Sequence, residues 1–562
     1  MTGRVRIIQA HPLLTAAFFV FFAVYAGSLN NGFHRDDFPH IVSNAFIRDL
    51  SSLPKLASRD YFQLNGSVAY RPAVAAVRCL EYKVFGLNPV LWRLFNLLLH
   101  AVNAALLCWI FLRVSGLPAA AAAGAALFLL HPAHTETLNY VSNGQCDLLC
   151  LFFLCVSFMA YLKESRPVSL SLFCLALLSK EMAAAFPLIL AVYAWFYGDL
   201  RKKWEVPACG AALALLFIIW RLVYFKAGPG FIDNVQAEAA FGFSAGGLAS
   251  AAGRFPLLIV YYLKLLLWPS VLSVELDRLL PEAGFFSGLN LTLAWLLAAS
   301  LAAAAFFYRR NRAYVILFIC FALALLPVAG LAPLTSLVQE HFVYIPSVFF
   351  CFSAGLVFAK AGEGKWRTAA IAAACLVLAL SAGRIWARNA DWKTPLALAQ
   401  SDLRNFPGSG TALLNLALQK RAAGDQDGAL ALCSEAAEKG AAGGEVYFLM
   451  AELYLRGGAA DKAVRAARLG LEKDPQKPDA LVNAARVYAG AGLLPEALKT
   501  AREAARRFPY FEPAFSALGE ILLLKKEPLE ARAMFAEAVR LNSRSPAARR
   551  LEELDRAAAG AR

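Results

Sequence analysis

Long apolar runs fill the first two thirds of this chain and limit its fold more than any other feature. A helix needs about 17 to 25 apolar residues to cross the hydrocarbon core of a bilayer. Runs of this kind lie near residues 11–29, 90–112, 118–138, 147–162, 182–198, 205–224, 252–270, 287–308, 313–332, 341–360 and 366–384. We therefore predict an all-α domain that crosses a membrane many times.

Composition agrees with a membrane protein and separates two parts of the chain. Of the 562 residues, 59% are hydrophobic and only 17% are charged, which is far from the balance of a soluble domain. Charged residues become common only beyond residue 385. We expect a membrane domain at 1–384 with a first outer loop at 30–88, a linker at 385–409 and a more polar domain at 410–562.

The net charge of +15 indicates orientation in the membrane rather than nucleic-acid binding. Lys and Arg gather in short loops between apolar runs, and such loops favour the cytoplasmic side. These loops lie at 4–6, 163–166, 201–203, 309–312 and 365–367. All of them face the cytoplasm if one run between 205 and 270 does not span. In that arrangement the first loop and the C-terminal domain lie outside the cytoplasm, and no nucleic-acid partner is expected.

The C-terminal domain carries an internal repeat of 34 residues. Alanines recur at this spacing as Ala429, Ala463, Ala497 and Ala531, and a second small position recurs as Ala417, Ala451, Ala485 and Gly519. Small residues at these positions let paired helices cross closely, and 34 residues is the length of the tetratricopeptide (TPR) helix-turn-helix unit. Repeats are predicted at 410–443, 444–477, 478–511 and 512–545. Such a solenoid usually binds extended peptide on its concave face, although it could also serve only to pack against the membrane domain.

Two acidic residues follow the first span almost directly. Asp36 and Asp37 are adjacent in the first loop. Like charges side by side repel, so one pKa tends to rise, and a carboxylate that faces a partly desolvated cleft can act as a general base. The alternative is a solvated loop in which one carboxylate caps a helix.

Further polar residues lie at the outer ends of the expected spans. A polar group inside a span is costly and points to a functional site, or else to a buried hydrogen-bond network. Arg93, Asn96 and His100 share one helical face. The other candidates on this side are Arg71, His131, His134, Glu136, Lys180, Glu181, Glu340, His341 and Tyr344.

Some of these residues have two interpretations. His131, His134 and Glu136 are close in sequence, but their spacing has no characteristic metal-ligand pattern, so the sequence leaves a divalent metal an open question. Lys180 could hold a phosphate group or could simply pair with Glu181.

These motifs, in this order and followed by TPR repeats, resemble the transmembrane and tetratricopeptide repeat-containing O-mannosyltransferases. The likeness covers nearly the whole chain, and one departure is His341, where relatives often have Arg. That family belongs to the GT-C class, so the resemblance implies a GT-C type membrane domain. The motifs are Asn31-Gly-Phe with Asp36-Asp37, Tyr70-Arg71-Pro72, Asn96 with His100, His131-Pro with His134-Thr-Glu136, Ser179-Lys180-Glu181, and Glu340-His341 with Tyr344-Ile-Pro346.

The resemblance implies transfer of a sugar, with mannose as the candidate, from a polyprenyl phosphate to Ser or Thr hydroxyls of proteins outside the cytoplasm. Asp36 or Asp37 would act as the general base of an inverting displacement, with Asp36 the first choice, and Glu136 would position the acceptor, a donor hydroxyl or a metal. The cations expected at the donor phosphate are Lys180, Arg71 and Arg221. The short repeat array and the lack of a disulfide framework indicate a bacterial inner membrane, with the TPR domain in the periplasm.

Two other functions remain open from the sequence. One is a non-enzymatic scaffold or a transporter that displays the TPR array, although a transporter would show an inverted internal repeat that this chain lacks. The other is a GT-C transferase that acts on a glycan or a lipid. The sequence does not indicate the sugar, the acceptor proteins or the oligomeric state.

Overall fold

The protein is described here from a computed structural model, and all its described regular elements are helices. The described residues are 12–44, 46–58, 61, 70–197, 203–226, 245–274, 288–306, 308–329, 338–439, 443–475, 477–509, 511–542 and 545–560. They form two units. The first contains most of the described residues up to 398, and the second contains those from 399 onward together with 54–58, 61 and 221–226.

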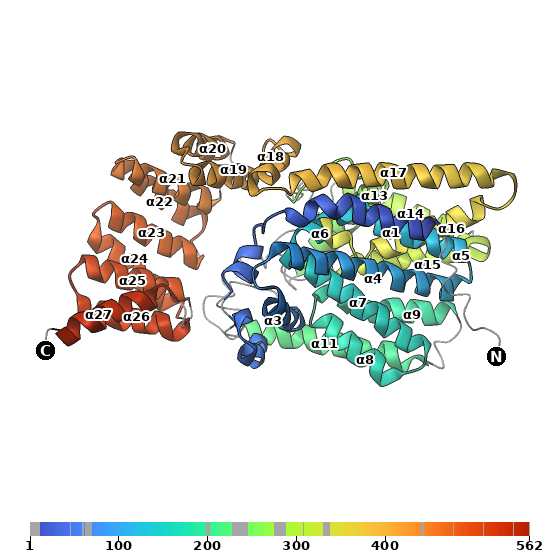
Figure 1. The fold of residues 1–562 in the computed structure, drawn as a ribbon, viewed down its shortest axis with the longest axis horizontal. Helices are drawn as coiled ribbons and strands as arrows, with labels where there is room; N and C mark the ends of the chain where they lie inside the picture. The colour runs from blue at the N-terminus through green and yellow to red at the C-terminus, as the bar shows by residue number, and fades with distance from the viewer. Residues whose placement is uncertain are drawn as a thin grey trace. The chain divides into compact units, whose positions relative to one another are not determined.

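The first unit is a bundle of helices that pack along their lengths (Figure 1). Its helices are α1 (Pro12–Ala26), α3 (Pro72–Phe85), α4 (Pro89–Ser115), α5 (Pro118–Leu129), α6 (Thr135–Asn139), α7 (Val141–Leu162), α8 (Arg166–Leu177), α9 (Phe186–Phe196), α11 (Glu205–Lys226), α13 (Ala245–Leu267), α14 (Gly288–Phe306), α15 (Tyr308–Leu325), α16 (Ser347–Ala361) and α17 (Arg367–Asp391). Several of them begin with proline, whose missing N–H costs nothing in the first turn.

The prediction of an all-α membrane fold is confirmed. Four described segments are long and apolar enough to cross a membrane, namely Pro12–Asn30, Pro89–Ser115, Val141–Leu162 and Gly364–Asp391. Some other apolar helices of this unit are shorter, between 10 and 17 residues, such as Pro118–Leu129 and Ser347–Ala361.

Some helices are shorter than the apolar runs that predicted them. In the run near 118–138, the α-helix ends at Leu129, and the 3-10 turn Pro132–His134 follows. The run near 341–360 begins with the 3-10 turn Glu340–Val343, and α16 starts only after Pro346. Proline ends or starts helices in this way because it lacks an N–H donor. These breaks place polar side chains at helix ends.

Close helix crossings hold the centre of the bundle together. Helices α5 and α16 meet at glycines, and a Cβ added at Gly355 would lie 2.3 Å from the carbonyl oxygen of Ala120. Small residues at a crossing allow this approach in apolar surroundings. Helix α4 packs on α5 and on α7, and α7 packs on α8.

The second unit contains the repeat helices, which stack as successive pairs (Figure 1). They are α19 (Gly410–Ala422), α20 (Gln426–Glu438), α21 (Gly444–Arg456), α22 (Ala460–Lys473), α23 (Pro478–Gly490), α24 (Leu494–Arg507), α25 (Glu512–Leu524) and α26 (Pro528–Leu541). In the chain, α18 (Pro395–Asn405) precedes them and α27 (Ala547–Gly560) follows them. In three pairs the turn between the two helices contains a glycine with positive φ, at Gly424, Gly458 and Gly492. The small recurring residues of the repeat, such as Ala463 and Ala497, are fully buried, as expected for a TPR solenoid.

Candidate functional site

The adjacent carboxylates after α1 have different environments. Asp36 is exposed, whereas Asp37 is fully buried. The Oδ2 atom of Asp37 accepts a hydrogen bond from the backbone N–H of His34 at 2.9 Å, and Oδ1 accepts one from that of Ser142 at 2.7 Å. Burial raises the pKa of Asp37, although these two hydrogen bonds act in the opposite direction. Asp37 therefore links the loop to the start of α7, and Asp36 faces outward.

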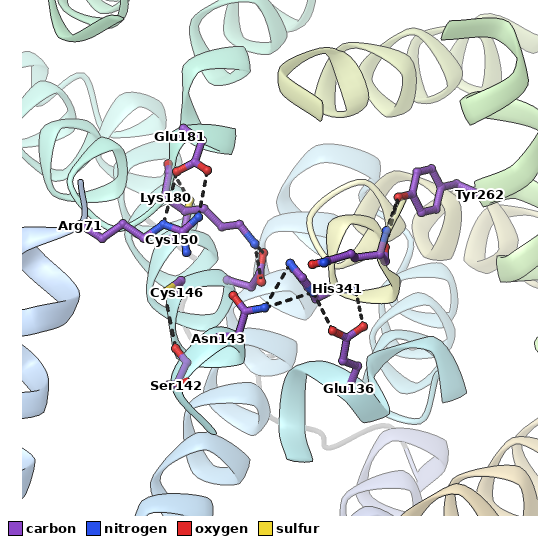
Figure 2. Close-up of polar contacts among 12 residues, drawn as sticks. Arg71, Glu136, Ser142, Asn143, Cys146, Cys150, Lys180, Glu181, Tyr262 and His341 are labelled. Carbon is purple, nitrogen blue, oxygen red and sulfur yellow. Dashed lines mark hydrogen bonds and ion pairs between the residues drawn. The ribbon is translucent and has the colours of Figure 1, made fainter. Parts of the chain in front are cut away.

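The third predicted carboxylate, Glu136, is paired with His341 (Figure 2). The Nδ1 atom of His341 lies 2.8 Å from Oε1 of Glu136, and the backbone N–H of His341 donates to Oε2 at 3.1 Å. His341 thus contacts the Glu136 carboxylate through both its side chain and its backbone. Asn143 lies beside the same imidazole, with its amide nitrogen 3.4 Å from Nε2.

Two of the predicted phosphate-binding cations already have carboxylate partners (Figure 2). The ammonium of Lys180 lies 2.7 Å from both carboxylate oxygens of Asp147, and this ion pair is buried. Arg71 pairs with Glu181 at 2.9 Å. The Lys180 ammonium also lies 5.5 Å from the centre of the Phe342 ring. Phe342 is the residue that follows His341 in the chain. The side chain of Arg221, the third predicted cation, lies outside the described residues.

Four other predicted residues, Asn96, His100, His134 and Tyr344, belong to a buried hydrogen-bonded layer between helices. His100 on α4 lies 2.8 Å from the Tyr344 hydroxyl, and the Nε2 atom of His134 lies 2.9 Å from the Ser347 hydroxyl. Asn96 donates to the carbonyl of Val141. This layer joins α4, α7 and the segment before α16.

The histidines of the 131–136 segment do not converge on a common point. His131 bonds to the carbonyl of Leu266, whereas His134 bonds to Phe128 and Ser347. Across the part of the chain that the structure describes, no three His, Cys, Asp or Glu side chains gather as a metal-ligand set.

Several residues of this region were not predicted as site residues. Asp147 is one of them, because its pairing with Lys180 depends on how the helices pack. Asn389 near the end of α17 accepts a hydrogen bond from Asn139 and donates to the carbonyl of Val24. Arg388 is fully buried, and one of its nitrogens lies 3.9 Å from Glu340. A charged residue at the end of an apolar run is itself a functional signal, and this signal could have found Arg388.

An apolar cavity lies next to this polar region. It has a volume of about 420 Å³ and is lined by side chains of α4, α7, α9, α15 and α16. Leu151, one helical turn after Asp147, lines it, as does Val348, one turn after Tyr344. Arg312 also lines the cavity, and its guanidinium lies 5.0 Å from the centre of the Phe196 ring. The cavity therefore extends from beside the polar groups along the bundle.

Comparison with known proteins gives sequence relatives but no family model that matches. The mouse protein O-mannosyl-transferase TMTC3 is 23% identical over 92% of this chain and 63% of its own length. The Caenorhabditis elegans protein O-mannosyl-transferase F38B6.6 is 23% identical over 70% of this chain and 57% of its own length. The human protein O-mannosyl-transferase TMTC4 is 31% identical over 25% of this chain and 22% of its own length.

Among solved structures, YrrB, a TPR protein with an unusual peptide-binding site, is 17% identical over 28% of this chain and 81% of its own, with a TM-score of 0.24. The TPR fold of the second unit is instead seen in its own helix pairs and in the 34-residue spacing of its alanines. The chain spans about three fifths of the length of the mouse and nematode relatives. Over most of its length, it is a sequence relative of proteins named protein O-mannosyl-transferases.

Proposed function

We propose that this membrane protein is a glycosyltransferase that moves a sugar, with mannose as the first candidate, from a polyprenyl-phosphate donor to Ser or Thr hydroxyls of proteins outside the cytoplasm. One observation carries the proposal. Carboxylates and cations from distant segments of the chain gather at the helix ends of one bundle, next to an apolar cavity. The names of the sequence relatives support the reaction class and a protein acceptor.

The proposed reaction is a single displacement with inversion at the anomeric carbon. Asp36 takes the proton of the acceptor hydroxyl while its oxygen bonds to the anomeric carbon. The bond from that carbon to the phosphate oxygen breaks, and the polyprenyl phosphate leaves with the electron pair. Asp36 is preferred over Asp37 because its carboxylate is exposed, whereas that of Asp37 is buried and accepts two backbone hydrogen bonds.

Cationic groups are needed where negative charge develops on the leaving phosphate. Lys180 and Arg71 are proposed for this role, together with Arg221. Asp147 and Glu181 hold the first two in place before the donor arrives, which reduces the reorganisation that the reaction requires. Glu136, held by His341, is proposed to position the acceptor or a donor hydroxyl.

The apolar cavity suits the lipid part of the donor. Its volume of about 420 Å³ lies in the range of small-molecule sites, and its lining residues are almost all apolar. Leu151 and Val348, which line the cavity, lie about one helical turn after Asp147 and Tyr344. If the polar groups hold the donor phosphate, its lipid chain could therefore extend into this cavity.

The TPR unit is proposed to hold the polypeptide that carries the acceptor hydroxyl, because such solenoids bind extended peptide. In the orientation set by the basic loops, this unit lies in the periplasm and the membrane unit in the inner membrane.

Transfer assays with the purified full chain test the proposal. The protein in lipid nanodiscs is incubated with radiolabelled polyprenyl-phosphate sugars and Ser/Thr-containing proteins. Asp36→Asn should lower the transfer rate by about 10²- to 10⁴-fold, the usual contribution of a general base. Asp49→Asn is the matched control, since Asp49 is another exposed carboxylate of the same loop, and it should transfer at the wild-type rate. Equal rates for wild type and Asp36→Asn, or no transfer by wild type from any donor, would remove the proposal.

A further inference from the structure

The acidic pair lies on a turn with a strained backbone. Arg35, the residue before Asp36, has a φ of 44°, in the left-handed region that non-glycine residues rarely adopt. Such strain persists only where the surrounding structure holds it, and it is common at functional sites. The contacts that hold this turn therefore decide where the Asp36 carboxylate points.

Arg93 on α4 holds the chain just before the turn. It is fully buried, and its guanidinium donates to the carbonyl oxygens of Asn31 at 2.5 Å, Gly32 at 2.6 Å and Asn139 at 3.1 Å. A planar guanidinium can serve several acceptors at once, which a lysine ammonium cannot do with the same geometry. Arg93 thus ties the acidic loop to the segment that precedes α7.

Tyr140 holds Asp36 itself. The backbone N–H of Asp36 donates to the Tyr140 hydroxyl at 3.0 Å. The ring of Tyr140 is fixed independently, since it belongs to a buried cluster with Val274, Trp392 and Leu398. The position of the Tyr140 hydroxyl is therefore fixed by this cluster and not by the loop.

The inner side of the turn is held as well. Asp37 accepts its two backbone hydrogen bonds from His34 and Ser142, and His34 in turn bonds to the carbonyl of Trp392 at 2.8 Å. Consecutive side chains of the turn therefore face opposite ways, Asp37 into the protein and Asp36 out of it.

From these contacts we infer that Tyr140 and Arg93 are positioning residues that hold the turn at Arg35 so that Asp36 alone of the acidic pair meets the acceptor hydroxyl. The inference rests on the proposed function, since it assigns Asp36 as the base. The structural part of the inference is that Tyr140 restrains the Asp36 amide. Hydrogen exchange can test this part even if the protein shows no transferase activity.

Tyr140→Phe is the sharpest variant, because it keeps the packed ring and removes only the acceptor of the Asp36 amide. In the full chain in nanodiscs, we expect kcat to fall by about tenfold to a hundredfold, as for a small misplacement of a catalytic group. The KM for the donor and the melting temperature should stay at the wild-type values. Amide hydrogen exchange of the peptide that contains Asp36 should become faster.

Tyr25→Phe is the matched control. Tyr25 is also a buried tyrosine of the first unit, and its hydroxyl has no hydrogen-bond partner among the described residues. This variant should keep the wild-type kcat and the wild-type exchange of the Asp36 peptide. Arg93→Lys, which keeps the charge, should speed exchange over residues 31–37. If the Arg93→Lys variant does not fold, the Tyr140→Phe variant alone still tests the inference.

The outcomes separate the inference from the proposed function. Unchanged exchange in Tyr140→Phe overturns the inference whether or not the protein is active. Faster exchange with a wild-type kcat also overturns it, because the restraint then has no part in the reaction. No transfer by the wild-type protein removes the proposed function, and the exchange measurement then tests the restraint alone.

Discussion

Lys180 and Asp147 show what a buried charge requires in the interior of a membrane protein. Both side chains are almost completely inaccessible, and the ammonium bonds to both carboxylate oxygens. Removing one partner of such a pair leaves an uncompensated charge, whereas replacing both with apolar residues can be neutral for stability. Stability and activity can therefore be separated at this pair.

Lys180→Met should destabilise the protein by about 3 to 5 kcal/mol, because the Asp147 carboxylate stays buried without a counterion. The double variant Lys180→Met, Asp147→Leu should regain most of that stability but should still bind the donor weakly, because the cation for the phosphate is gone. Thermal unfolding in nanodiscs and donor-binding measurements give the two quantities. Wild-type donor affinity in the double variant would exclude Lys180 from the donor site.

The His34 imidazole should make stability depend on pH. Burial, with the nearby Arg93 charge, lowers the pKa of His34 from its ordinary 6.5 to about 4. The unfolded chain binds the proton more readily, so this contribution is present above pH 6.5 and is lost as the pH falls towards 4. The shift corresponds to about 3 kcal/mol at most.

The measurement compares unfolding temperatures at roughly pH 7.5 and pH 4.5, on either side of the ordinary histidine pKa. Wild type should lose more stability over this interval than His34→Gln, which can still donate to the carbonyl of Trp392 but does not titrate. Parallel pH curves for the two proteins would show that His34 titrates normally in the folded state.

At the scale of helices, close crossings set the geometry of the bundle. Gly355 on α16 faces the backbone of α5, and an added Cβ would also lie 2.9 Å from the N atom of Gly124. Such a contact cannot be relieved by a side-chain rotation, because the neighbouring atoms belong to a helix backbone. The two helices would have to separate.

Gly355→Ala should therefore destabilise the first unit by about 1 to 3 kcal/mol, the usual cost of overpacking. Gly383→Ala on α17 is the control, because no atom lies within 4 Å of its added Cβ. Alanine there should be neutral or should stabilise by up to about 1 kcal/mol, since it favours the helix more than glycine does. Equal losses in the two variants, measured by thermal unfolding, would contradict the role of close approach.

For the whole molecule, the charge distribution predicts which side of the membrane the TPR unit occupies. Basic loops favour the cytoplasm, and the loop at 163–166 is one of them. Labelling with a membrane-impermeant maleimide tests the resulting orientation, in a background where the exposed Cys209 and Cys375 are replaced.

Lys499→Cys, at an exposed position on α24, should react in intact spheroplasts if the TPR unit lies outside the cytoplasm. Lys163→Cys, at an exposed position after α7, is the control and should react only after the membrane is disrupted. The opposite pattern would place the repeats in the cytoplasm and would leave them unable to hold a periplasmic acceptor.

Local sequence properties were enough to predict the class of fold. The length of an apolar run and a 34-residue period are visible without any tertiary contact, so the all-α membrane unit and the repeat helices could be expected from them. The polar candidates could be found for the same reason, because a residue such as His100 is conspicuous within an apolar run.

Contacts between distant segments could not be read in this way. That Asp37 faces inward and Asp36 outward depends on Ser142 and Tyr140, more than a hundred residues away. The pairing of Lys180 with Asp147 likewise depends on how α7 packs beside the end of α8. Each of these side chains has several partners available in the sequence, and only packing of the helices selects one of them.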